Sequence, residues 1–86
     1  MPTKDRTADT PVKADETLDL RGLKCPLPAL FAKRALVRNA HGRVIEVVCD
    51  DPMASIDVPH MCRQENIEVL HEARDGAVVR LWLRKP

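Results

Sequence analysis

Cys25 is the residue of this chain best suited to chemistry, because it stands directly before two closely spaced prolines in the tetrapeptide Cys25-Pro26-Leu27-Pro28. Proline is tolerated in the first turn of a helix, where N–H groups have no partner within the helix. The tetrapeptide therefore predicts a helix start with Cys25 near the N-cap, Pro26 at N1 and Pro28 at N3. The positive end of the helix dipole favours a thiolate at that place and lowers the thiol pKa. We expect an exposed, activated nucleophile that attacks sulfur, carbonyl carbon or a metal.

Positive charge near Cys25 is expected to add to this effect. Lys24 precedes the thiol and Arg21 lies in the same loop, although the effect of exposed charges is screened by salt. Prolines carry no N–H, so the Leu27 N–H is the expected hydrogen-bond donor to sulfur. Because position 28 holds proline and not cysteine, the dithiol chemistry of a C-x-x-C motif is absent. This favours transfer from Cys25 to another protein.

Composition limits the class of protein. The 86 residues correspond to one domain, and the formal net charge of +1 at pH 7 is too small for a protein whose main ligand is nucleic acid. Three cysteines, an odd number, argue against a disulfide scaffold and for a reducing compartment, so a cytoplasmic location is expected. No apolar run reaches membrane-spanning length, and the N-terminus does not read as a signal peptide. We expect a monomer without membrane association.

The pattern of apolar residues predicts the fold class. Residues 1–16 are polar without periodicity and are expected to be a disordered tail before a single domain over residues 17–86. Alternation, β-branched runs and helix-start signals predict strands over 17–20, 43–49, 67–73 and 77–84, and helices over 26–40 and 52–64. Right-handed crossovers would place both helices on one face of the sheet. The prediction is an α+β, two-layer sandwich of order β-α-β-α-β-β, with a four-stranded mixed sheet.

The second predicted helix begins with two aspartates and a proline. Asp51 is expected to be its N-cap and Pro52 its N1 residue. Asp50 is expected to be solvated or paired with a nearby base. Pro59 lies inside the helix and is expected to kink or divide it.

The first predicted helix has two candidate core faces. One face is a stripe of mostly small residues, Ala29, Ala32, Leu36 and Ala40. The other face is bulkier and lies beside arginines, and it consists of Leu27, Leu30 and Phe31. If the small residues pack on the sheet, Leu30, Phe31 and Arg34 form a candidate docking surface beside the thiol. If the bulkier residues are the core, that surface does not exist. The helical pattern leaves both alternatives open.

Three segments of the chain resemble the TusA/SirA-like family of small sulfur carrier proteins. They are residues 18–28 with the Cys-Pro-x-Pro signature, the Asp50-Asp51-Pro52 helix start, and residues 57–62, which contain Asp57, Pro59 and Cys62. The resemblance covers about residues 17–85, nearly all of the part that is expected to fold. It implies the same β-α-β-α-β-β sandwich.

The resemblance also implies a function. Proteins of this family accept sulfane sulfur from a donor, commonly a cysteine desulfurase, and a rhodanese-type donor is a further possibility. They hold the sulfur as a persulfide on the signature cysteine, Cys25 here, and pass it to an acceptor protein. The implied role is a sulfurtransferase-like carrier, not a stand-alone enzyme, with no cofactor besides the transient persulfide. Branches of the family serve tRNA thiolation, molybdenum cofactor maturation and sulfur oxidation.

Other interpretations of the same residues are structural. Cys49 and Cys62 are expected to pack in the core, because free cysteines are usually buried. The spacing of cysteines and histidines matches no zinc template, so no metal site is predicted. The alternative to a carrier is a non-catalytic protein-binding or regulatory module in which Cys25 is a structural helix cap. An RNA-binding sandwich is disfavoured by the near-neutral charge and the lack of stacking aromatic residues.

Overall fold

Six regular elements follow one another in the predicted order. The computed structural model describes residues 12–85. The elements are β1 (Glu16–Asp19), α2 (Leu27–Arg38), β2 (Val44–Cys49), α3 (Ala54–Gln64), β3 (Glu68–Asp75) and β4 (Val78–Arg84). The predicted boundaries differ from these by two residues or fewer. The part of the chain described contains no helix that is long and apolar enough to cross a membrane.

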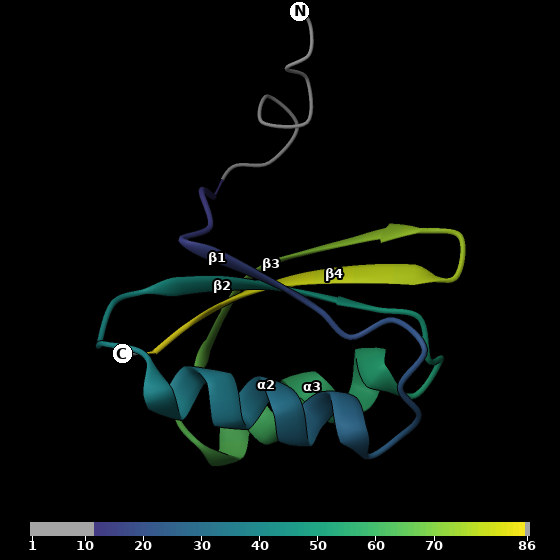
Figure 1. The fold of residues 1–86 in the computed structure, drawn as a ribbon, viewed down its shortest axis with the longest axis horizontal. Coiled ribbons are helices and arrows are strands. Elements are labelled where there is room, and N and C mark those ends of the chain that lie inside the picture. Colours follow the sequence, from purple (N-terminus) through teal and green to yellow (C-terminus); the bar gives the residue numbers. More distant parts are fainter. Residues whose placement is uncertain (1–11, 86) are drawn as a thin grey trace, which may run out of the picture.

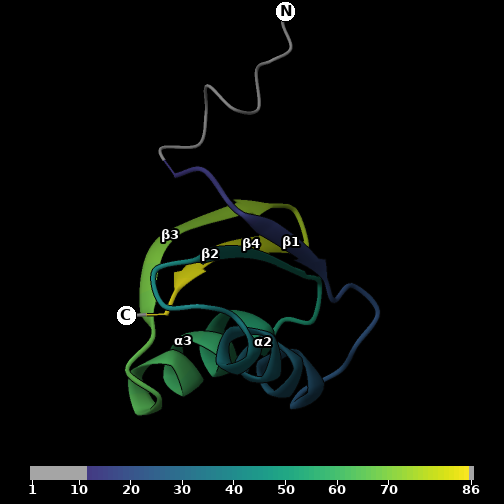
Figure 2. The ribbon, with the colours of Figure 1, turned by 60° about the vertical axis from the view of Figure 1, so that its left-hand side comes forward.

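The four strands form one mixed sheet of order β1-β2-β4-β3. β1 is parallel to β2, whereas β4 is antiparallel to both β2 and β3. Both helices cover the same face of this sheet, which leaves the other face open (Figures 1 and 2). The predicted two-layer α/β sandwich is therefore confirmed.

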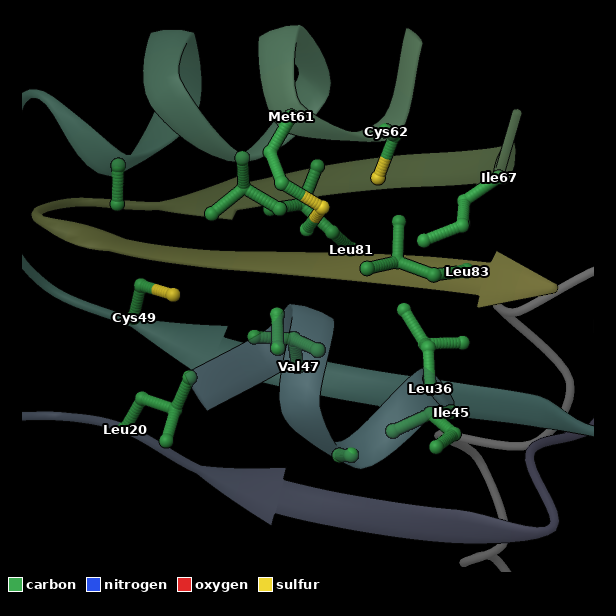
Figure 3. Close-up of a cluster of buried hydrophobic side chains, with 14 of the residues drawn as sticks. Leu20, Leu36, Ile45, Val47, Cys49, Met61, Cys62, Ile67, Leu81 and Leu83 are labelled. Atoms are coloured by element: carbon green, nitrogen blue, oxygen red, sulfur yellow. The ribbon is translucent and has the colours of Figure 1, made fainter. Parts of the chain in front are cut away.

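The core lies between the sheet and the helices, and it decides which face of α2 is buried. Ala32, Ala35 and Leu36 are almost fully buried, whereas the side chains of Leu30 and Phe31 remain 53% and 39% exposed. The small-residue alternative is thus correct for Ala32 and Leu36, with Ala29 partly buried, and it lets α2 lie close to the sheet. Its last member, Ala40, was placed wrongly, because it lies beyond the end of α2 and is exposed. Figure 3 shows Leu36 of α2 beside Ile45 of β2 in this core.

Helix α3 starts later than predicted and is not divided. Its first residue is Ala54 and its N-cap residue is Met53, so Asp51 and Pro52 lie in the turn before the helix. The Ala54 N–H donates to the Asp51 carbonyl at 2.9 Å, which closes this turn. Pro59 lies inside a continuous helix, so of the two predicted effects, a kink or a division, the division does not occur.

The folded part begins before residue 17. The Asp15 N–H donates to the Val44 carbonyl at 2.8 Å, and the Asp15 carboxylate accepts from the Val44 N–H at 2.8 Å. Glu16 is the first residue of β1 and is in register with Ile45. The predicted tail therefore extends too far at its C-terminal end, because both residues join the sheet. Its first eleven positions lie outside the described residues.

The open face of the sheet carries charged side chains in cross-strand pairs. Arg80 of β4 binds Glu46 of β2 at 2.9 Å, and Arg84 binds Glu68 of β3 at 2.6 Å. Trp82, between them on β4, is only 4% exposed and contacts the ring of His71 at a centroid distance of 5.2 Å. Exposed large apolar side chains instead gather on and next to the helices, with Val69 of β3 as the exception.

Candidate functional site around Cys25

Cys25 lies in the loop between β1 and α2, and its side chain is exposed. Pro26 is the N-cap residue of α2, so Leu27 is N1 and Pro28 is N2, one position later than predicted. The shift arises because a turn precedes the helix: the Leu27 N–H donates to the Lys24 carbonyl at 2.8 Å. The prediction that Leu27 donates to the Cys25 sulfur is therefore wrong. The Cys25–Pro26 peptide bond is cis.

Two adjacent aspartates at the end of β2 hold the Cys25 loop in place. The Cys25 N–H donates to Oδ2 of Asp51, and the Gly22 N–H donates to Oδ1 of Asp50 at 2.9 Å. Gly22 has a φ of +89°, a backbone conformation that favours glycine. Asp51 is buried, and its Oδ1 accepts from the Met53 N–H at 3.2 Å. Asp51 thus caps the turn before α3. Asp50 accepts a hydrogen bond from a backbone N–H group, whereas the sequence predicted that it is solvated or paired with a base.

The thiol itself contacts α3. Cys25 Sγ donates a hydrogen bond to Oδ2 of Asp57, a half-buried residue in the first turn of that helix. This hydrogen bond, with desolvation and the negative charges of Asp57 and Asp51, raises the pKa of the Cys25 thiol above its ordinary value. The prediction of a lowered pKa is therefore wrong for the protein alone, because carboxylates surround the sulfur.

The expected cationic support for a thiolate is also absent from the contacts of the described residues. The guanidinium of Arg21 binds Asp19, with Nη2 and Oδ2 2.8 Å apart and Nε and Oδ1 2.9 Å apart. This pairing lowers the pKa of Asp19 to about 2. Lys24 takes part in the site through its backbone carbonyl, as described for Leu27.

A hollow of about 310 Å³ opens between α2 and α3 next to the Cys25 loop. It is lined by Pro26, Ala29, Leu30, Lys33, Asp57, His60, Met61, Gln64 and Glu65. Lys33 and Glu65 form an ion pair of 3.1 Å across the two helices. Asp57, whose carboxylate binds the thiol, is also one of the residues that line this hollow.

Comparison with known proteins identifies the family. Residues 16–85 match the family model described as "Sulfurtransferase TusA". The chain belongs to the TusA family. This confirms the resemblance inferred from the sequence, and the match to the TusA family includes the Cys25 loop and both helices.

Two known proteins are similar to this chain, one in sequence and one in fold. The chain is 28% identical over 74 residues to "Putative sulfur carrier protein YrkI" of Bacillus subtilis (strain 168), covering 86% of this chain and 99% of that protein. It is also similar to the crystal structure of a SirA-like protein from Desulfitobacterium hafniense, with a TM-score of 0.70 and 24% identity. That alignment covers 80% of this chain and 95% of the other, and it shows that the two folds are alike.

The other two cysteines of this TusA-family chain lie in the core. Cys49 and Cys62 are fully buried, and Figure 3 shows both side chains in the layer between sheet and helices. Burial raises the pKa of each thiol to about 11. Cys62, one of the residues on which the sequence resemblance rested, is therefore kept from Cys25 by its burial.

Around Cys25, the exposed apolar residues of the TusA-family chain come from both helices. Leu27, Leu30 and Phe31 are exposed on α2, and Arg34 is exposed on the same helix. Met53 and Ile56, 45% and 59% exposed, lie at the start of α3 and were not expected from the sequence. No group of three or more metal-binding side chains occurs within residues 12–85.

Proposed function

We propose that this chain is a sulfur carrier that accepts sulfane sulfur as a persulfide on Cys25 and passes it to an acceptor protein. The observation that carries the proposal is the contrast among its three thiols. Cys25 is exposed in the loop before α2, within the residues that match the TusA family, whereas Cys49 and Cys62 are buried. Only an accessible thiol can attack sulfur on another molecule.

The transfer needs no cofactor. The Cys25 sulfur attacks the terminal sulfur of a persulfide on the donor, a bond forms between them, and the sulfur–sulfur bond of the donor breaks. The donor leaves as a thiol, and the proton lost from Cys25 balances the one that it gains. The step exchanges one persulfide for another and is redox-neutral. Delivery to the acceptor repeats it in the opposite direction.

A donor or acceptor protein must reach an exposed sulfur at the end of a helix. The apolar side chains of Leu27, Leu30 and Phe31 lie beside that end, and Arg34 is one turn further along α2. We take this surface as the docking site for a partner with apolar and acidic groups, because exposed apolar patches and complementary charge favour association. A cysteine desulfurase or a rhodanese-type protein is the proposed donor.

The pathway that receives the sulfur is a separate question from the transfer reaction at Cys25. The family resemblance points to tRNA thiolation, molybdenum cofactor maturation or sulfur oxidation as the destination of the sulfur. These destinations differ in the acceptor protein, and the site around Cys25 would serve each of them by the same exchange.

Intact-protein mass spectrometry tests the proposal. The reduced protein is incubated with a cysteine desulfurase and cysteine labelled with a sulfur isotope, or with a rhodanese and labelled thiosulfate. The expected result is a gain of labelled sulfur that a reductant removes and that the Cys25→Ser variant lacks. Circular dichroism should show that Cys25→Ser is folded, because an exposed thiol contributes little to packing.

A matched control is Cys62→Ser, which keeps Cys25 and changes a buried thiol. It should still gain sulfur, to the extent that it folds. If the wild-type protein gains no label from either donor system, the proposal is overturned. The non-catalytic binding module, with Cys25 as a structural residue of the loop, then becomes the better explanation.

A further inference from the structure

The side chain of Asp57 has one role among the described contacts: it accepts the hydrogen bond of the Cys25 thiol. Asp57 is half-buried at the start of α3, and it forms no ion pair with any residue in the range 12–85. Its negative charge is therefore directed at the reactive sulfur and at the adjoining hollow.

The other charges near the sulfur do not cancel that of Asp57. A second carboxylate, that of Asp51, binds the Cys25 N–H. The cations nearby are engaged elsewhere, since Arg21 binds Asp19 and Lys33 binds Glu65 across the hollow. Lys24 is exposed to water, which screens its charge, and His60 lies on the exposed rim of the hollow. The charged groups that act on the sulfur are therefore two carboxylates, that of Asp57 in direct contact with the thiol and that of Asp51 from a buried position.

This arrangement distinguishes between sulfur donors by charge. An anionic donor is repelled by Asp57 and Asp51, whereas a cationic group beside the donor sulfur is attracted. A cation can also pair with the Asp57 carboxylate, which then releases the hydrogen of the thiol. The Cys25 proton leaves more readily, and the sulfur becomes nucleophilic when such a donor is bound.

We propose that Asp57 is a specificity-determining residue for sulfur transfer to Cys25, and that it favours donors with a positively charged group next to the transferred sulfur. The inference rests on the proposed function, because it concerns the substrate class of the same thiol. In the favoured reaction the Cys25 sulfur bonds to the outer sulfur of the donor persulfide, whose inner sulfur leaves as a thiol. Small anionic donors, such as thiosulfate without an enzyme, are disfavoured.

Small disulfides provide a test that needs no protein partner. The probes are cystamine, which is cationic, bis(2-hydroxyethyl) disulfide, which is neutral, and 3,3′-dithiodipropionate, which is anionic. Cys25 forms a mixed disulfide with one half of each probe, and the other half leaves as a thiol, so the reaction balances. Rates are followed by intact mass, and Cys25→Ser identifies the reacting thiol. Because the probes differ in leaving group, the ratio of their rates is compared between variants and not between probes.

The decisive variant is Asp57→Asn, which removes the charge at nearly constant size. At low salt, the cationic-to-anionic rate ratio should fall about three- to tenfold relative to wild type, as expected for the loss of one charge near the sulfur. The neutral probe should react faster, because the hydrogen bond to the carboxylate is lost. Added salt should reduce the wild-type ratio toward that of the variant.

Two further variants serve as controls for Asp57→Asn. Asp75→Asn removes the same charge from the exposed β3–β4 hairpin, where asparagine before Gly76 is equally suited to the turn, and it should leave the ratio unchanged. Asp57→Ala lacks the amide of asparagine and should behave like Asp57→Asn. Circular dichroism checks that each variant is folded. An unchanged ratio in both folded Asp57 variants, or an equal change in Asp75→Asn, overturns the inference.

Sulfur loading separates this inference from the proposed function. If the wild-type protein loads labelled sulfur but the Asp57 variants keep the wild-type probe ratio, the carrier function stands and the role of Asp57 is overturned. If the ratio changes as expected but no donor system loads sulfur, the carrier function is overturned, and with it the claim that Asp57 selects sulfur donors.

Discussion

The backbone N–H of Cys25 donates a hydrogen bond to Oδ2 of Asp51, which lies 26 residues later in the chain. The second oxygen of the same carboxylate accepts from the Met53 N–H at 3.2 Å, at the turn before α3. One buried side chain therefore ties the loop that carries the thiol to the start of the helix that carries Asp57. The position of the sulfur against Asp57 depends on this link.

Replacing Asp51 should destabilise the protein more than replacing its neighbour. Asp51→Ala leaves the N–H groups of Cys25 and Met53 without their acceptor, and we expect the free energy of unfolding to fall by about 1–3 kcal/mol. Urea denaturation followed by the fluorescence of Trp82, the single tryptophan, measures this change. Asp50→Ala, which removes a hydrogen bond to Gly22 at a less buried site, is the control. Equal losses in the two variants would contradict the linking role of Asp51.

The close approach of α2 to the sheet predicts intolerance of larger side chains on its inner stripe. Ala32 is fully buried, so Ala32→Leu should lower the free energy of unfolding by about 1–3 kcal/mol through overpacking. Leu30→Ala, on the exposed side of the same helix, should change it by less than about 0.5 kcal/mol. The measurement is the same urea titration. A neutral Ala32→Leu would mean that α2 has room to move away from the sheet.

The exposed face of α2 should matter for partners and not for the thiol itself. Phe31→Ala and Arg34→Glu are each expected to lower the kcat/KM of sulfur loading from a donor enzyme about three- to tenfold. Their reaction with the neutral disulfide probe should stay as in wild type, because neither side chain contacts Cys25 among the described interactions. Val37→Ala, 59% exposed further along α2, is the matched control. Parallel losses in both assays would point to a disturbed site, not to docking.

The two buried thiols predict a loss of stability at alkaline pH. Burial raises the pKa of Cys49 and Cys62 from an ordinary value of 9.0 to about 11. The folded state keeps these protons where the unfolded state loses them, so the free energy of unfolding falls as the pH rises from 9 to 11. The expected contribution is on the order of 2 kcal/mol for each thiol.

Urea titrations between pH 8 and pH 11 measure this slope. The chain contains no tyrosine, so the cysteines and lysines are the side chains that titrate in this range. Cys62→Ala leaves a cavity and lowers stability at every pH, but it should make the pH dependence shallower. An unchanged slope in Cys62→Ala would show that this thiol loses its proton over the same pH range in the folded and the unfolded chain, so that burial does not raise its pKa.

The order of the elements could be predicted because it depends on local patterns. β-Branched runs mark β2 and β4, Asp75-Gly76 marks the hairpin, and prolines mark both helix starts within two residues. The helix boundaries shifted because backbone turns precede both helices, with Lys24 and Asp51 as acceptors, and such turns carry little sequence signal. The importance of Cys25 was likewise evident from its own neighbours in the chain.

The state of the Cys25 sulfur was decided by the tertiary structure alone. From the sequence, the nearest charges are the helix dipole and the cations Lys24 and Arg21, which together predict a lowered thiol pKa. In the fold, Asp57 comes from 32 positions away to accept the thiol hydrogen, and Arg21 is paired with Asp19. Electrostatic effects depend on distance in space, and the hydrogen-bonded carboxylate of Asp57 is the largest cause of the raised pKa of the thiol. The sequence by itself therefore determined which thiol is the candidate for reaction, and the packing of α3 against α2 placed beside it the carboxylate that raises its pKa.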